Sequence, residues 1–137
     1  MKLHHVQLSM RPGGEDLARG FYAGALEFTE VPKPEALHGR GGCWFRAFDG
    51  GALSAELHLG VDPGFEPPRK AHPALLVAGR AELEALADRI RALGCPVDFS
   101  ERTSFAGYER FHARDPFGNR LEFLAPLSAD QTHGDFP

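Results

Sequence analysis

Residues 108–125 of this chain read YERFHAR DPFGN RLEFLA, and this stretch decides the fold. Within 108–114 and 120–125, apolar residues occupy alternate positions at Phe111 and Ala113 and again at Leu121 and Phe123, a pattern typical of strands that bury one face. Between the two runs stand Asp, Pro, Phe, Gly and Asn, a composition that favours a tight turn. The stretch therefore predicts a hairpin formed by the last two strands.

Two helices are expected upstream of this hairpin, among further strands. Apolar residues recur at helical spacing over residues 15–26, where Leu17, Phe21 and Ala25 form one stripe. The same spacing predicts a helix over residues 80–93, ended by Gly94, with an apolar face of Leu83, Leu86, Ile90 and Leu93. Strands are expected over residues 2–10, 28–31, 42–48, 53–61, 71–77 and 97–99.

The two halves of the chain share one order of elements: strand, helix and three strands. They also share residues at a nearly constant spacing. His5, Ala25 and Leu26 recur 67 residues later as His72, Ala92 and Leu93, and Phe45, Asp49 and Glu56 recur 66 residues later as Phe111, Asp115 and Glu122. This ordered set predicts an internal duplication. We expect an α+β fold in which two βαβββ modules form curved mixed sheets, with the helices on the outer face.

The duplication also predicts the domain boundaries. One domain is expected over residues 1–125, with module one at 1–61, a linker rich in proline and charge at 62–70, module two at 71–125 and a loose tail at 126–137. A chain of 137 residues suits one domain of ordinary size.

Composition excludes several classes of partner. Lys and Arg total 15 against 19 Asp and Glu, so the net charge of −4 offers no basic field for nucleic acid. No apolar run approaches the roughly 20 residues that span a bilayer, and the first residues lack the apolar stretch of a signal peptide, which predicts a cytoplasmic protein without membrane contact. Cys43 and Cys95 are too few for a disulfide framework and are expected to be buried thiols.

Side chains alternate across a strand, so the predicted strands divide into two faces. One face is entirely apolar and needs the helices to cover it: Val6, Leu8, Phe45, Ala47, Leu57, Leu59, Leu75, Val77, Phe111, Ala113, Leu121 and Phe123. The other face is dominated by His, Glu, Arg and Trp and contains no Lys: His5, Gln7, Trp44, Arg46, Glu56, His58, His72, Arg110, His112, Arg120 and Glu122, with Leu3, Ala74, Leu76 and Leu124 as apolar exceptions. This composition favours the lining of a pocket over a solvated sheet surface.

Four residues of the polar face form a candidate metal site. His5, His72 and Glu122 lie on the first strand of each module and the last strand of the second, and the repeat adds Glu56. Two imidazoles with one or two carboxylates suit a divalent ion such as Fe, Mn, Ni, Co or Zn and leave positions open for substrate. His58 shares a face with Glu56, so either residue could complete the site, or His58 could support it from outside.

The remaining polar residues are candidates for substrate binding. Arg46, Arg110 and His112 could orient an anionic group, and Trp44 could line the pocket. No glycine-rich phosphate loop and no Ser- or Cys-centred nucleophile motif is present in the sequence.

Several motifs together resemble those of the glyoxalase/bleomycin-resistance group of the vicinal oxygen chelate superfamily. The resemblance runs from about residue 3 to residue 124. Its motifs are HHVQL at 4–8, FY before GAL at 24–26, ELHLG at 56–60, HPAL at 72–75 and DPFGNRLEF at 115–123. It implies paired βαβββ modules with cup-like sheets and a homodimer whose sites are shared between chains.

Carried over by position, the resemblance implies metal ligands at His5, Glu56, His72 and Glu122. Glu56 and Glu122 are also the candidate catalytic residues, and Glu56 is either the fourth ligand or, if substrate displaces it, the base that moves a proton between adjacent carbons. Ser9 and Gly60 stand where glyoxalase I has residues that grip glutathione, which argues against a glutathione substrate. We expect a metal-dependent lyase, isomerase or dioxygenase that binds a small oxygenated metabolite through two oxygens. The alternative is a metal-free protein that sequesters a drug, with aromatic residues such as Trp44 dominating its affinity.

Overall fold

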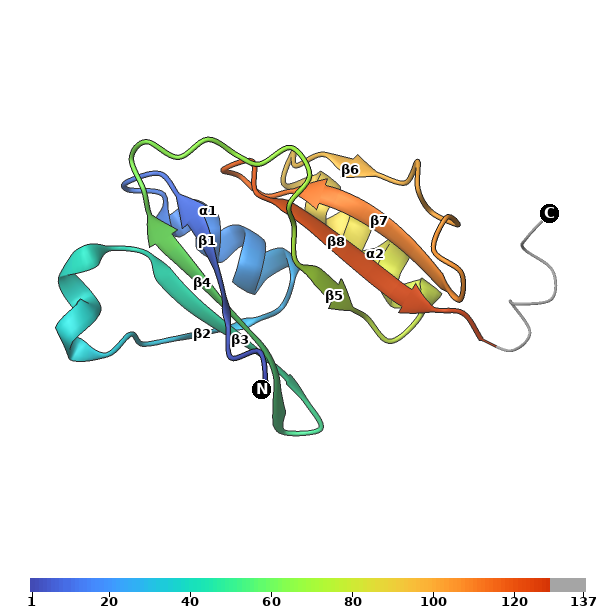
Figure 1. Cartoon of the computed structure of the whole chain (residues 1–137), viewed down its shortest axis with the longest axis horizontal. Coiled ribbons are helices and arrows are strands. Elements are labelled where there is room, and N and C mark those ends of the chain that lie inside the picture. Colours follow the sequence, from blue (N-terminus) through green and yellow to red (C-terminus); the bar gives the residue numbers. More distant parts are fainter. Residues whose placement is uncertain (129–137) are drawn as a thin grey trace. The chain divides into compact units, whose positions relative to one another are not determined.

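The computed structural model describes residues 1–128, which form two compact units with one four-stranded sheet each (Figure 1). Unit 1 comprises residues 1–67 and 116–119, and unit 2 comprises residues 68–115 and the chain from residue 120 onward. Most of the expected loose tail lies outside the described residues.

Unit 1 contains the sheet β1-β4-β3-β2. Its strands are β1 (Val6–Met10), β2 (Thr29–Val31), β3 (Cys43–Asp49) and β4 (Ala52–Val61). Between them lie the helix α1 (Glu15–Ala18), the π-helix η1 (Arg19–Ala25) and the 3-10 helix η2 (Glu35–Arg40). β1 runs parallel to β4, whereas the other neighbours are antiparallel, so the sheet is mixed as expected.

Unit 2 repeats this plan in the sheet β5-β8-β7-β6. Its elements are β5 (Ala74–Leu76), α2 (Arg80–Ala92), β6 (Val97–Asp98), β7 (Tyr108–Arg114) and β8 (Arg120–Pro126). β5 is parallel to β8, and the other neighbours are antiparallel. The predicted α+β fold of two βαβββ repeats with mixed sheets is therefore confirmed.

Each sheet buries its apolar face beneath the helical elements of its own unit. Figure 1 shows α2 lying across one face of the sheet of unit 2. Phe45, Leu57 and Leu59 are at most 1% exposed in unit 1, as are Phe111 and Phe123 in unit 2. Burying one side chain of this size contributes about 1.5–3 kcal/mol. The opposite face of each sheet is therefore left to carry the polar residues.

The first helical segment differs from the expected single helix over residues 15–26. Only four residues form α1, and the chain then widens into η1, where the amide of Leu26 donates to the carbonyl of Phe21. Leu17, expected in the buried stripe, is 57% exposed, and the buried residues of this segment are Ala18, Phe21, Tyr22 and Ala25.

Two smaller expectations in unit 2 were also wrong. Leu93 is 49% exposed because α2 ends at Ala92, although Gly94 follows with a φ of 78° as expected for a residue just past a helix end. The strand expected over residues 71–77 shortens to β5, since Pro73 has no N–H to donate to the sheet.

Residues 116–119, the turn between β7 and β8, are grouped with unit 1 by their contacts. Phe117 is 2% exposed, its ring lies 5.7 Å from the guanidinium carbon of Arg11, and the Nδ2 of Asn119 donates to the carbonyl of Ser9 at 2.7 Å. A Cβ on Gly14 would lie 2.6 Å from the Phe117 ring, so this close approach requires glycine.

Both cysteines are buried and free, as expected, and burial raises the pKa of the Cys43 thiol to about 11. Within residues 1–128, no helix combines the length and the apolar character needed to cross a membrane.

Candidate metal centre

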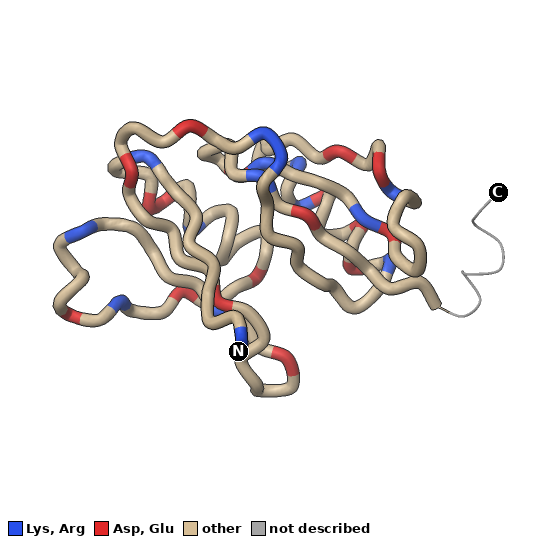
Figure 2. Tube along the Cα trace, in the orientation of Figure 1, with Lys and Arg blue, Asp and Glu red and all other residues tan. Residues whose placement is uncertain are grey.

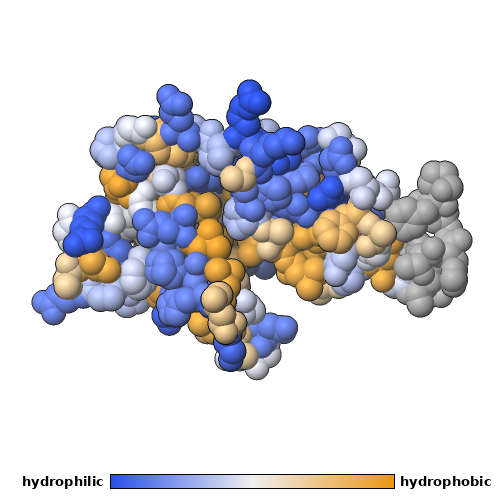
Figure 3. Space-filling model, viewed as in Figure 1, coloured by the Kyte–Doolittle hydropathy of each residue, from blue (hydrophilic) through white to orange (hydrophobic). Residues whose placement is uncertain are grey.

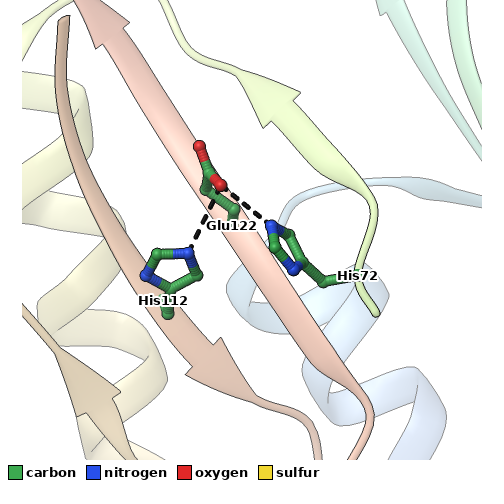
Figure 4. Close-up of side chains that lie close together, drawn as sticks. All are labelled: His72, His112 and Glu122. Atoms are coloured by element: carbon green, nitrogen blue, oxygen red, sulfur yellow. Dashed lines mark hydrogen bonds and ion pairs between the residues drawn. The ribbon is translucent and has the colours of Figure 1, made fainter. Parts of the chain in front are cut away.

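Three side chains meet on the polar face of the unit 2 sheet (Figure 4). His72 comes from the segment before β5, His112 from β7 and Glu122 from β8. The Nε2 of His72 lies 2.9 Å from Oε1 of Glu122, and the Nε2 of His112 lies 3.3 Å from the same oxygen. One carboxylate oxygen thus joins two imidazoles from distant parts of the sequence.

Sheet register brings these residues together. His112 is directly opposite Glu122 in the antiparallel pair of β7 and β8, and residues opposite one another on one face are close enough for their side chains to touch. Ala74 is the parallel partner of Glu122 in β5, and His72 precedes it by two residues on the same side. Register therefore places His112 beside Glu122, and the segment before β5 adds His72.

Burial and charge set the protonation of the cluster. Burial disfavours ionisation of Glu122, but the hydrogen bond from His72 and the charge of Arg110 outweigh this and hold the pKa of the carboxyl below its ordinary value. Burial and the nearby charge of Arg120 lower the pKa of His112. An ionised carboxylate beside a neutral imidazole is the state in which both can bind a cation.

Arg110, expected to orient substrate, is engaged with neighbouring groups. Its NH1 lies 3.3 Å from Oε1 of Glu122, its NH2 donates to the Ser104 hydroxyl at 2.8 Å and its Nε donates to the Glu101 carbonyl at 3.2 Å. The guanidinium therefore braces the carboxylate from one side.

The donors of this cluster fit a divalent transition metal. Within residues 1–128, these three potential ligands form a cluster whose donor atoms all lie within 4.8 Å of one another. Glu122 is 4% and His112 7% exposed, so both are shielded from water. The side chain of His72 is 23% exposed and is therefore accessible to solvent. Two imidazoles and one carboxylate are a donor set typical of Fe, Mn, Co, Ni or Zn with open coordination positions.

The related positions of unit 1 form a different arrangement. The Nε of Arg46 donates to Oε1 of Glu56 at 2.9 Å, and Glu56 is 5% exposed. Burial disfavours its ionisation, but the hydrogen bond and the charge of Arg46 outweigh this and lower the pKa of the carboxyl. This carboxylate is thus already neutralised by a permanent cation.

Aromatic rings stack beside this ion pair. Trp44 and His58 lie parallel with ring centroids 3.8 Å apart, and His5 stacks on the other side of His58 at 4.1 Å. The Nε2 of His58 is 3.4 Å from Oε1 of Glu56 without hydrogen-bond geometry, and it has no hydrogen-bond partner among the described residues. Burial lowers the pKa of His58, which favours the neutral imidazole.

The four ligands expected from the sequence are divided between the two units. His5 and Glu56 belong to unit 1, and His72 and Glu122 belong to unit 2, where they lie in contact. Convergence of all four on one ion stays a prediction. His112, expected to bind substrate, lies in contact with Glu122, and its role in substrate binding stays a prediction. The hairpin could have indicated this, because His112 and Glu122 are each five residues from Phe117 at the centre of the turn.

The family model described as the Glyoxalase/Bleomycin resistance protein/Dioxygenase superfamily matches residues 2–123. A solved structure of a protein assigned to the glyoxalase family, from Bacillus anthracis, is 35% identical to this chain, with a TM-score of 0.77 over 93% of this chain and 96% of that one. The resemblance expected from the motifs is confirmed. Comparison with curated proteins finds no match.

More distant structures share the fold alone. The fosfomycin resistance protein FosX from Listeria monocytogenes is 16% identical, with a TM-score of 0.69 over 96% of this chain and 98% of its own. The hypothetical protein SA1046 from S. aureus is 19% identical, with a TM-score of 0.68 over 91% of this chain and 97% of its own.

Proposed function

Because the chain belongs to the Glyoxalase/Bleomycin resistance protein/Dioxygenase superfamily, we propose that it is a metal-dependent enzyme that binds a small oxygenated molecule through two of its oxygens. The observation that carries the proposal is the cluster of His72, His112 and Glu122, whose donor atoms lie within 4.8 Å of one another. Its donors are the residue types that hold divalent transition metals in proteins.

In this proposal His72 and Glu122 hold the ion, and coordination is completed by His112 or by His5 and Glu56. A divalent ion, when bound, supplies a Lewis acid that stabilises negative charge on substrate oxygens. His58 is the alternative to Glu56 as a ligand, because its Nε2 is buried and has no hydrogen-bond partner among residues 1–128.

In this proposal Glu56 would accept a proton from the bound substrate. The Arg46 hydrogen bond keeps Glu56 ionised, which is the form that accepts a proton. A substrate anion that drew Arg46 away would raise the basicity of Glu56 at the moment of binding. Arg110 would keep Glu122 oriented by the contact at 3.3 Å.

The proposal is tested by titrating the metal-free chain with Ni, Co, Mn, Fe and Zn in a calorimeter. We expect stoichiometric binding of at least one ion, and we expect acetohydroxamate, a small ligand with two adjacent oxygens, to raise the melting temperature only of the loaded protein. Absence of stoichiometric binding for all five ions would contradict the metal-dependent function.

The stack in unit 1 favours a second function, namely metal-free sequestration of a planar or cationic drug. Trp44 and His58 already stack at 3.8 Å, and aromatic faces of this kind bind flat or cationic molecules. This function predicts that replacement of Trp44 by Leu abolishes ligand binding and that a chelator has no effect. The metal-dependent function predicts instead that a chelator abolishes ligand binding and that replacement of Trp44 by Leu does not.

We also propose a homodimer, as is common in this superfamily. Sedimentation should then give a particle of about twice the 15.0 kDa chain mass. A 15.0 kDa particle at working concentration would contradict the dimer.

A further inference from the structure

A pocket of about 190 Å³ lies within unit 2, next to the cluster of His72, His112 and Glu122. We call it the arginine pocket, because its charged lining residues are Arg69, Asp98, Arg114 and Arg120, with His112 as a shared wall. Its volume is below the roughly 300 Å³ of ordinary small-molecule sites, so it suits one chemical group of a ligand.

The arginine pocket concentrates positive charge in a chain whose net charge is −4. Three guanidinium groups face one carboxylate in its lining. Figure 2 shows basic positions gathered where the segment before β5 passes the end of β7 and the start of β8. The surface over this place is strongly hydrophilic in Figure 3.

Two of these arginines differ from the other arginines of the polar faces. Arg46 and Arg110 each lie against a buried glutamate, at 2.9 and 3.3 Å. Arg69 and Arg120, by contrast, form no ion pair with a carboxylate among residues 1–128. Their charge is therefore not neutralised by a direct contact within the described chain.

Backbone carbonyls accept hydrogen bonds from Arg120 and Arg114 in the arginine pocket. Arg120 donates through NH1 to the carbonyl of Lys70 at 2.9 Å, and this nitrogen is 3.3 Å from Nδ1 of His72. Arg114 donates to the carbonyls of Pro68 and Arg69 at 2.7 and 3.2 Å. Asp98, opposite His112 in register, accepts the amide of Ser100 at 2.8 Å. These bonds orient guanidinium groups without cancelling their charge.

We propose that the arginine pocket binds a small oxyanion, a carboxylate or phosphate group, held by Arg69 and Arg120. Guanidinium groups suit this ligand because their planar N–H donors match two oxygens of one anion. An anion in the pocket would lie against His112 and thus beside the candidate metal centre. The binding itself needs no metal and does not rest on the proposed function.

The test is calorimetric titration of the full chain, in chelator and low-salt buffer, with inorganic phosphate and separately with acetate. Arg69→Gln and Arg120→Gln should each weaken binding roughly tenfold, the loss expected for one charge-assisted hydrogen bond. Arg40→Gln, an exposed arginine of unit 1, is the matched control and should leave binding unchanged. The ratio of phosphate to acetate affinity identifies the preferred anion.

Absence of binding of both anions to the unaltered chain would overturn the proposal, as would an equal loss in Arg40→Gln. Arg69 is exposed, so Arg69→Gln carries the test if circular dichroism shows that Arg120→Gln is unfolded. Anion binding in chelator together with failure of all metal titrations would support the arginine pocket and contradict only the metal-dependent function.

Discussion

The polar faces of the two units are related by the same sequence repeat, but the residues that surround their buried glutamates differ. Glu56 and Glu122 are repeat-related and equally buried, at 5% and 4% exposure. Across the sheet, the partner of Glu56 is Arg46, whereas the partner of Glu122 is His112. The residue opposite the buried carboxylate is thus a permanent cation in unit 1 and an imidazole in unit 2, where Arg110 contacts Glu122 in addition, at 3.3 Å.

This difference has a direct chemical consequence. A guanidinium has no lone pair to offer and stays protonated, so Arg46 neutralises Glu56 but excludes itself as a ligand. An imidazole can give up its proton to the solvent and bind a metal through the same nitrogen. Unit 2 is therefore the better candidate for holding an ion on its own, and unit 1 for positioning a carboxylate.

The largest expected effect comes from removing the carboxylate of unit 2. Glu122→Gln should weaken binding of the preferred metal by more than about 100-fold, beyond the loss typical of residues outside the coordination shell. Glu56→Gln should cost less, because the residue opposite Glu56 is Arg46, which has no lone pair for a metal, whereas two imidazoles lie against Glu122. Calorimetric titration of both variants measures the difference, and equal losses would show that the two half-sites contribute alike.

Exchanging the register partners sharpens the comparison. His112→Arg gives unit 2 the side chain of unit 1. We expect metal affinity to fall about 10- to 100-fold, because an imidazole donor is lost and a second cation besides Arg110 then lies against Glu122. Arg46→His is the reciprocal variant and should leave binding intact or strengthen it. A His112→Arg protein with unaltered affinity would exclude His112 from the centre.

His5→Ala tests whether the units share one ion. If His5 is a ligand, metal affinity should fall at least about tenfold. His4→Ala is the neighbouring control, since His4 is a solvent-exposed histidine whose Nδ1 lies 2.9 Å from Nδ1 of His5. An unchanged affinity in His5→Ala would remove His5 from the site and leave the unit 2 cluster as the centre.

A smaller effect is expected at the repeat-related pair Cys43 and Glu109. Unit 2 has a buried glutamate here, in ion pairs with Arg80 and Arg102, whereas unit 1 has a thiol. Burial disfavours ionisation of Glu109, but the hydrogen bonds from both arginines outweigh this and lower the pKa of the carboxyl. Glu109→Gln should therefore lower the free energy of unfolding at pH 7 by about 1–2 kcal/mol.

The contribution of Glu109 to stability should depend on pH. A lowered folded pKa stabilises the protein above the unfolded value near 4.5, and the contribution disappears as the pH falls through the folded value. The difference in unfolding free energy between Glu109→Gln and the unaltered chain should thus shrink as the pH falls below about 4.5. Urea denaturation at pH 7 and at pH 3 measures this decline, and a difference that is undiminished at pH 3 would assign the loss to packing.

Local pattern was sufficient for much of the fold. The alternation from Tyr108 to Arg114 predicted β7 with the bounds that the structure has, and the stretch before Gly94 predicted α2 to within one residue. These signals are local, because the side-chain period of a strand or helix depends only on its own backbone. The widened η1 was missed because it depends on how Phe21 and Tyr22 pack against the sheet.

The sequence by itself determined that His, Glu and Arg share one face of each sheet, because a period of two assigns every strand residue to a side. Which of them touch was decided by tertiary structure. Opposition of His112 to Glu122 requires the register of β7 and β8, and the arginine pocket requires residues 68–70 to pass beside both strands. Such contacts join residues up to 50 positions apart, and only the folded chain brings them within hydrogen-bond distance.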